Sequence, residues 1–455
     1  MGAAPPRERP GSADMTVNHV FTGIRTALST SAPFLLLACA LVAFAYWMLD
    51  PNPPRRVVLA TGVAQGAYAE FGQRYAERLK QHGITVELRN TQGAAENLAL
   101  LRDASSGVQI GFVQGGASEM PDAETALKSP LQSLGSMFYE PVWLFYRSDS
   151  AQRLLKKPTL DSLSQLEGWR VNIGAAGSGV PHLATQLLEA NRIDPRAIAL
   201  SQQPVTPAVI EMLESRLDAL VLTSAPESAM VQMLLQTPGI ALFDFAQADA
   251  YTRRFGFLSA VTLPRGVVDL ARDMPATDVR MVAPTATLVV REDLHPALAQ
   301  LFVQAAREVH GNSGWFQRKG DFPNARDGER ALAPEAERFY RSGVPWLQRY
   351  LPFWLANLVD RMWLAMLSIV AVLLPLSRIV PPLIELRIRS RVFRWYAQLR
   401  QIESDVRARP AKELLDGLDA IEDKVNAIQV PLSYTDELYA LKSHIQMVRR
   451  RLQTA

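Results

Sequence analysis

The chain has a single cysteine, Cys39, so it cannot form an internal disulfide framework or a cysteine-based zinc site. Its six histidines are scattered along the sequence, and none belongs to the His-Glu-x-x-His spacing that holds a metal on one helix face. The formal net charge of +3 is small for 455 residues and gives no support for nucleic-acid binding. We therefore expect neither a metal site nor a nucleic-acid partner.

Complete nucleotide-binding and nucleophile motifs are also missing. Residues 174–179 match the first half of a P-loop, but Val180 and Pro181 stand where lysine and serine or threonine would hold phosphate and Mg²⁺. Ala176 breaks the Gly-x-Ser-x-Gly nucleophile elbow, and residues 62–66 lack the Gly-x-Gly-x-x-Gly fingerprint. We expect no cofactor, no catalytic residue and no enzymatic activity, and loops suited to holding a ligand.

The first long apolar run, residues 32–49, carries no charge and ends near Tyr46 and Trp47. It is just long enough to cross a bilayer of roughly 30 Å, and the aromatic residues suit a membrane interface. A cleaved signal peptide and a lipoprotein signal around Cys39 are the alternatives. We interpret the run as an uncleaved membrane anchor.

A second apolar run covers residues 355–378. Trp354 and Trp363 lie near its beginning, and Arg378 at its end can extend toward the opposite interface. A buried helix of a soluble domain is the alternative, but the length and the tryptophans favour a transmembrane helix.

Arginines predict the membrane topology. They follow the second run in the segment 387–400 and precede the first at residues 7, 9 and 25. The positive-inside rule then places both termini in the cytoplasm and residues 54–350 outside it, in the periplasm if the membrane is a bacterial inner membrane. Residues 1–31 are expected to be disordered.

The tail, residues 384–455, is charged and has apolar residues at near-heptad spacing, interrupted at Pro410 and Pro431. This pattern predicts a helical hairpin or coiled coil that could also mediate self-association. A solvated charged tail without a core is the alternative.

Between the two apolar runs, β-like segments alternate with helical patterns. Segments 57–60, 84–88 and 108–113 read as strands, and each is followed by a glycine-rich or polar turn at 62–68, 91–97 or 114–118. Strands that alternate with helices predict a parallel α/β sheet. Loops at the carboxyl ends of such strands meet in one crevice, where helix N-termini favour an anion.

The same rhythm returns from residue 170 to residue 243, with the glycine-rich loop 174–179 after the first strand. This indicates a second lobe inserted into the first. We predict that lobe one covers residues 55–146 and 251–345, and lobe two residues 150–248.

Several of these motifs resemble the TAXI-type solute-binding proteins of TRAP transporters over residues 55 to 310. They are Ala60-Thr61-Gly62-x3-Gly66-Ala67-Tyr68, Thr91-x-Gly93-Ala94-x-Glu96-Asn97-Leu98, Gly111-Phe112-Val113-Gln114, Leu166-Glu167-Gly168-x-Arg170-Val171-x-Ile173-Gly174-x-x-Gly177-Ser178-Gly179 and Leu217-Asp218-Ala219 with residues 223–226. Ala67 and Ala94 depart from the family by removing hydroxyl groups. The segment 339–355 resembles that of a membrane-anchored subgroup.

The resemblance implies a two-lobed domain of the type II periplasmic-binding-protein kind. Such a receptor closes on a small organic anion or amino acid and delivers it to TRAP permease subunits, with glutamate-type amino acids and C4-dicarboxylates as the first classes to consider. The ligand-binding residues it implies are Gly62, Gly66, Tyr68, Thr91, Asn97, Gln114, Ser178, Gly179, Thr223 and Ser224. Of these, Ser178 and Gly179 would donate to the carboxylate.

Two of these residues have a structural alternative: Asn97 as a helix cap and Tyr68 as packing between the lobes. At the level of the whole chain, the alternative is a signalling or scaffold protein that senses a ligand outside the cell and acts through its tail. A hydrolase or transferase is the third possibility, but the sequence offers no credible nucleophile–base pair.

Overall fold

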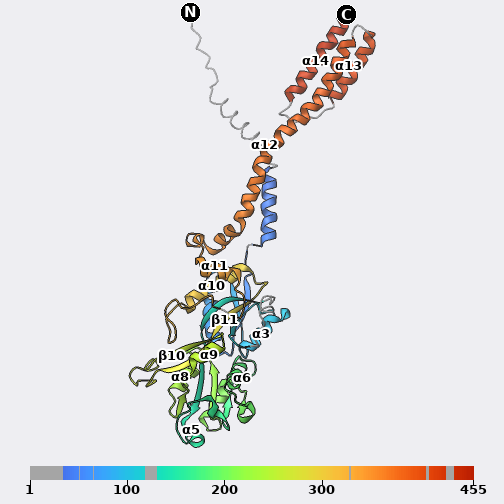
Figure 1. Ribbon diagram of the computed structural model, residues 1–455. Helices are drawn as coiled ribbons and strands as arrows, with labels where there is room; N and C mark the ends of the chain where they lie inside the picture. The colour runs from blue at the N-terminus through green and yellow to red at the C-terminus, as the bar shows by residue number, and fades with distance from the viewer. Residues whose placement is uncertain are drawn as a thin grey trace, which may run out of the picture. The chain divides into compact units, whose positions relative to one another are not determined.

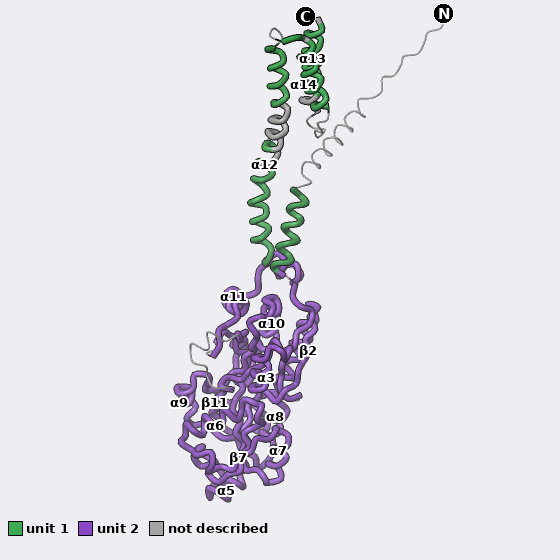
Figure 2. The backbone as a smooth tube through the Cα atoms, turned by 90° about the vertical axis from the view of Figure 1, so that its right-hand side faces the viewer, with its two compact units in different colours: residues 1–49, 361–455 green, residues 50–360 purple. Residues whose placement is uncertain are grey.

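The computed structural model describes residues 34–50, 52–64, 66–117, 131–326, 329–405, 409–426 and 435–454. The chain divides into two compact units, residues 50–360 and residues 1–49 with 361–455 (Figure 2).

The first sheet of the 50–360 unit has three parallel strands, β1 (Arg56–Ala60), β2 (Thr85–Arg89) and β3 (Ile110–Gln114). The long strand β11 (Val279–Arg291) lies antiparallel beside β3 and also pairs with β4 (Leu131–Tyr139) and β10 (Leu258–Leu263). Helices that pack in this lobe are α2 (Ala67–Lys80), α3 (Ala94–Arg102), α10 (Pro296–His310) and α11 (Pro334–Ser342) (Figure 1).

The second sheet has the order β7 (Ala199–Ser201), β6 (Arg170–Asn172), β8 (Ala219–Thr223), β5 (Val142–Arg147) and β9 (Ile240–Leu242). Its helices are α5 (Ser148–Leu155), α6 (Val180–Ala190), α7 (Val205–Leu213), α8 (Ala229–Leu235) and α9 (Ala248–Arg254). Short 3₁₀ turns occur at η1 (Ala104–Ser106), η2 (Leu163–Leu166), η3 (Pro195–Ala197) and η4 (Trp346–Arg349). The sheet follows the pattern of the first, because three parallel strands are followed by an antiparallel strand that comes from the other lobe. The predicted two-lobed α/β fold is confirmed.

The border between the lobes differs from the expected one at residue 146. Strand β5 pairs with β8 and β9, so it belongs to lobe two, and the chain crosses over at Glu140 and Pro141. The return strand β11 begins at Val279 and first packs against lobe-two residues such as Trp143. The two crossovers lie side by side, since the backbone N–H of Glu140 donates to the carbonyl of Pro284 at 2.9 Å.

Helix α2 illustrates how the sequence forms the first lobe. Tyr68, Phe71, Tyr75 and Leu79 recur at helical spacing, and all four are buried against the sheet. The ring of Tyr75 stacks on Phe302 of α10 at 5.6 Å. Each such side chain stabilises the lobe by about 1.5–3 kcal/mol through removal of apolar surface from water.

One described helix is long and apolar enough to cross a membrane. Helix α12 runs from Phe353 to Ser404, and its segment Phe353–Ile379 has this character. The first apolar run forms the helix Phe34–Leu49, which is shorter than the ~20 residues of a typical span. Within the described residues, therefore, one of the two expected membrane helices meets the length criterion. The expectation for residues 1–31 lies outside the described part of the chain.

The tail forms helices α13 (Ala411–Asn426) and α14 (Thr435–Thr454), which pack with the end of α12. Leu418, Val425 and Ile445 are fully or almost fully buried in their shared core. Arg449 of α14 pairs with Asp419 and Glu422 of α13. The apolar residues at near-heptad spacing therefore form the core of a packed helical module.

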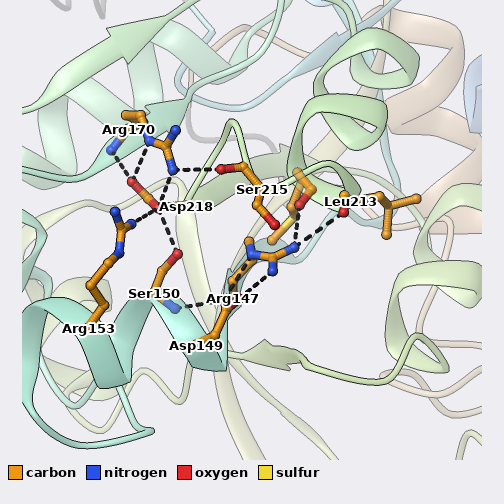
Figure 3. A network of polar contacts seen from close by, with 9 residues as sticks. Arg147, Asp149, Ser150, Arg153, Arg170, Leu213, Ser215 and Asp218 are labelled. Atoms are coloured by element: carbon orange, nitrogen blue, oxygen red, sulfur yellow. Dashed lines mark hydrogen bonds and ion pairs between the residues drawn. The ribbon is translucent and has the colours of Figure 1, made fainter.

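At the amino-terminal end of β8, Asp218 joins three elements of lobe two (Figure 3). Its carboxylate accepts hydrogen bonds from Ser150 at 2.7 Å, Arg153 at 2.6 Å and Arg170 at 2.8–3.0 Å. Burial would raise the pKa of Asp218, but the bonds from Arg170 and Ser150 outweigh it and lower the pKa to about 2. The residue therefore supports the fold at the end of the sheet opposite the carboxyl ends of its strands.

We predict that Asp218→Asn lowers the free energy of unfolding by about 2–3 kcal/mol, since it weakens charge-assisted hydrogen bonds to a buried acceptor. Because the folded pKa of Asp218 is lowered, its stabilisation is present above pH ~4 and lost as the pH falls toward 2. Hydrogen exchange of lobe-two peptides in the full chain between pH 3 and pH 7 measures both effects. Equal protection in the variant and the parent at pH 7 would contradict the prediction.

Candidate functional site

A cavity of about 150 Å³ lies between the two lobes. Lobe one contributes the loops after β1, β2 and β3, and lobe two the loops after β6, β7 and β8. These are the carboxyl ends of the parallel strands, the edge at which open α/β sheets bind ligands.

Eight of the ten predicted ligand-binding residues line this cavity: Gly62, Gly66, Tyr68, Gln114, Ser178, Gly179, Thr223 and Ser224. Segments more than 150 residues apart in the sequence are thus brought together as the loop pattern predicts. Thr91 and Asn97 do not line it.

Thr91 and Asn97 lie beneath the loops, where both are buried. The hydroxyl of Thr91 donates to Asn97 Oδ1 at 2.6 Å, and Asn97 Nδ2 donates to the carbonyls of Thr61 and Phe112. All of these polar atoms are satisfied within the protein. Asn97 holds the ends of β1 and β3 together and is not the side-chain cap of α3, whose N-cap residue is Gly93.

Four helices of nine or more residues begin at the cavity: α2, α3, α6 and α7. Their N-cap residues are Gly66, Gly93, Gly179 and Pro204, and none caps its helix with a side-chain hydrogen bond. The first N–H groups of a helix have no intrahelical acceptor and carry the positive end of the helix dipole. Pro181 and Pro207 remove one N–H from the first turns of α6 and α7, and the N–H of Glu96 in α3 already donates to Gly177. The remaining first-turn N–H groups around this cavity form a seat for an anionic group.

The role expected for Ser178 needs correction. Its hydroxyl donates to the carbonyl of Ala175 at 2.6 Å, and its backbone N–H donates to the same carbonyl at 2.9 Å. Both donors are therefore used inside the turn that precedes α6. The N–H of Gly179, which has no acceptor among the described residues, is the donor this turn presents.

Gln114 connects the two lobes. Its Oε1 accepts a hydrogen bond from the hydroxyl of Thr223 at 2.6 Å, across the cavity from β3 to β8. Its Nε2 is buried and has no partner among the described residues. A buried donor without a partner costs about 1–3 kcal/mol, so this amide is suited to a ligand oxygen.

Glu140 also lines the cavity, although no motif in the sequence indicated it. It is almost completely buried, and its Oε2 accepts a hydrogen bond from the Tyr68 hydroxyl at 2.7 Å. Burial raises the pKa of Glu140 to about 7, although the bond from Tyr68 offsets part of this rise. One signal was present in the sequence, because Glu140 is the lone charged residue between two strongly apolar segments.

Tyr68 therefore has two structural functions besides facing the cavity. Its ring stacks on Phe112 at 5.0 Å, and its hydroxyl orients Glu140. Desolvation and the neighbouring carboxylate keep the pKa of Tyr68 well above its usual value.

The rims of the two lobes touch at glycines. The backbone N–H of Glu96 donates to the carbonyl of Gly177 at 3.1 Å, and a Cβ at Gly177 would lie 2.6 Å from the Cβ of Gln92. A Cβ at Gly93 would lie 3.2 Å from the Cα of Ser178. Only glycines permit this close approach of the lobes.

Two α/β lobes with a ligand-sized cavity between them define the class of solute-binding proteins. The chain belongs to the NMT1-like family, whose model matches residues 59–312. Among curated proteins, none matches the sequence.

The chain is similar to several solved structures, including a protein from Bordetella bronchiseptica RB50, with 14% identity, a TM-score of 0.39, and 56% of this chain and 71% of that chain covered. The periplasmic aliphatic sulphonate binding protein SsuA from Escherichia coli has 13% identity and a TM-score of 0.34, with 71% of this chain and 83% of that chain covered. The alkanesulfonate-binding protein SsuA from Xanthomonas axonopodis pv. citri has 15% identity and a TM-score of 0.31, with 45% and 69% covered. The family assignment rests on the sequence match and not on these likenesses.

We predict that Glu140→Gln stabilises the ligand-free protein at pH 8 by up to about 3 kcal/mol, because ionisation of the buried carboxyl then no longer opposes folding. The folded pKa is raised, so the penalty is complete above pH 7 and disappears as the pH falls toward 4.5. Hydrogen exchange of the β1 and β3 peptides between pH 5 and pH 8 measures the difference.

The control for this measurement is Glu337→Gln, since Glu337 is exposed on α11. A Glu140→Gln effect at pH 8 no larger than that of the control would contradict the prediction.

Proposed function

We propose that this chain is a membrane-anchored extracytoplasmic receptor that binds a small carboxylate and delivers it to the membrane subunits of a TRAP-type permease. The observation that carries the proposal is the convergence of four uncapped helix N-termini and the unpaired Gln114 amide on one cavity. The solute classes to test first are amino acids and C4-dicarboxylates.

The physical basis for anion binding lies in the backbone. Each helix N-terminus stabilises a nearby negative charge by about 0.3–1 kcal/mol at an exposed site, and by up to ~2 kcal/mol when partly buried. Among the described residues that line the cavity there is no lysine, arginine or histidine. Backbone amides and Gln114 therefore supply the positive potential that would attract a carboxylate.

Two strand connections favour capture by rotation of the lobes. The lobes are joined where β4 passes into β5 and along β11, and such short crossovers can absorb a hinge motion. The hydrogen bond from Thr223 to Gln114 and the contact at Gly177 would form as the lobes close. A ligand that contacts both lobes would favour the closed state.

Binding without turnover fits the chemistry of the cavity. Ser178, the one residue near a nucleophile motif, uses its hydroxyl in the turn, and His182 faces Gln186 at 3.1 Å on its own helix. Loss of a measured turnover in Ser178→Ala would argue for an enzyme.

For the membrane, we propose two anchors. The Phe353–Ile379 segment supports the second anchor, and the shorter apolar helix Phe34–Leu49, with the uncharged residues 32 and 33 before it, is proposed as the first. The arginine distribution supports a bacterial inner-membrane protein with its binding domain in the periplasm and both termini in the cytoplasm.

We predict that Gly177→Ala weakens ligand binding at least tenfold and leaves stability nearly unchanged. The added Cβ would lie 2.6 Å from Gln92 Cβ only when the lobes touch, so it obstructs closure and not folding. Calorimetry of the full chain in detergent with L-glutamate, L-valine, succinate and methanesulfonate measures the affinity.

Gly256→Ala is the matched control, because a Cβ at Gly256 has no neighbour within 4 Å. If the parent chain binds none of the three carboxylate probes, the carboxylate-receptor proposal fails, even if methanesulfonate binds. If Gly177→Ala binds as tightly as the control, the closure mechanism fails while binding stands.

The packed core of the tail favours a second candidate, a receptor that signals through this module. Leu418, Leu441 and Ile445 are fully buried, as expected of a folded domain and not of a solvated tail.

We predict that deletion of residues 391–455 leaves solute uptake by cells within about twofold, since the binding site lies in the other unit. Unchanged uptake would argue against the signalling candidate, whereas loss of uptake at normal protein levels would favour it.

A further inference from the structure

The cavity at which the helix N-termini meet is also lined by a buried carboxyl group. These two features together limit which ligands can bind there. Among the described residues that line the cavity, Glu140 is the only one with a charged side chain. Tyr68 is the hydrogen-bond partner of its Oε2, and no described residue donates to its Oε1. The carboxyl group thus has acceptor capacity that the protein does not use.

We propose that Glu140 is the counter-ion for an ammonium group of the ligand, so that the solute is a zwitterionic α-amino acid and not a dicarboxylate. The inference rests on the proposed carboxylate-receptor function and refines it. The helix N-termini receive the carboxylate, and Glu140 receives the ammonium group.

Charge complementarity favours this assignment over a dianion. A second carboxylate inside a cavity of about 150 Å³ would lie within several ångströms of Glu140, where like charges repel strongly in a poorly solvated site. An ammonium group at the same distance attracts the ionised carboxylate and offsets its desolvation. One ligand then satisfies both the amide donors and the buried acid.

The remaining wall indicates the kind of side chain. Val63, Val180, Val205, Leu222 and Met230 line the cavity and present apolar surface. A dry cavity near 150 Å³ holds a molecule about the size of benzene. An amino acid with a small or medium uncharged side chain fits this space and this lining better than one with a second charge.

The position of Glu140 also connects recognition to the hinge. The residue lies at the β4–β5 crossover, and its backbone N–H donates to Pro284 in the returning strand. A ligand that binds its carboxylate contacts the segment about which the lobes would turn.

The experiment compares each amino acid with the 2-hydroxy acid of the same shape, which lacks the ammonium group. Calorimetry on the full chain in detergent at pH 8 uses L-alanine, L-valine, L-leucine and L-glutamate, their 2-hydroxy counterparts, and succinate. We expect at least one uncharged amino acid to bind 100-fold or more tightly than its 2-hydroxy acid. In Glu140→Gln, which keeps an oxygen to accept from Tyr68, we expect this ratio to fall below about fivefold, with the hydroxy acid bound as tightly as before or more tightly.

Glu337→Gln, an exposed charge removal on α11, should keep the parent ratio. If succinate or a 2-hydroxy acid binds as tightly as every amino acid, or if Glu140→Gln keeps the ratio, the inference is wrong while the carboxylate receptor stands. If no probe binds, the proposed function fails with it. If near-ultraviolet circular dichroism shows that Glu140→Gln does not fold, the affinity ratio of amino acid to 2-hydroxy acid in the unaltered chain still tests the inference.

Discussion

The hydrogen bond between the Glu140 N–H and the Pro284 carbonyl marks the point on which the binding domain depends. Two strands pass there between the sheets, and each sheet is completed by an antiparallel strand that arrives from the other half. Neither lobe can therefore detach, and the relative motion left to them is a rotation about this pair of strands. The same connectivity turns the carboxyl ends of both sets of parallel strands toward one another, which creates the cavity.

The electrostatics of the site follow from that geometry. Uncapped helix N-termini give a positive potential that cannot be titrated, because it comes from peptide dipoles. Glu140 provides one negative group whose charge depends on its surroundings, because burial holds its pKa near neutrality. In the proposed receptor, fixed backbone donors would give affinity for an anion, and the one titratable acid would select for a second group on the same ligand.

Much of the fold could be predicted from the sequence, because its signals are local. Apolar runs such as 57–60 and glycine turns such as 62–68 recur in the order that defines parallel α/β units, and the structure contains them. The allocation of β5 to lobe two could not be predicted, because an antiparallel strand looks the same whichever sheet it joins.

The loops that form the site could be predicted, but the sequence does not show which of their polar side chains are hydrogen-bonded within the protein. Thr91 and Asn97 are polar residues in the correct loops, yet the Thr91 hydroxyl donates to Asn97 Oδ1, and Asn97 Nδ2 donates to the carbonyls of Thr61 and Phe112 below the cavity. The hydroxyl of Ser178 similarly donates to the carbonyl of Ala175. Which side chain is satisfied internally and which, like Gln114 Nε2, remains available depends on distances that only the assembled lobes define.

The amide of Gln114 has one consequence for how such a protein can change over time. Its oxygen accepts a hydrogen bond from Thr223 in the opposite lobe, while its buried nitrogen has no partner among the described residues. In the proposed receptor, a replacement at this position would change both ligand affinity and the hydrogen bond between the lobes in a single step. A change of ligand during evolution would therefore begin more easily at Val63, Val205 or Met230, where the side chain can change shape without breaking the hydrogen bond between the lobes.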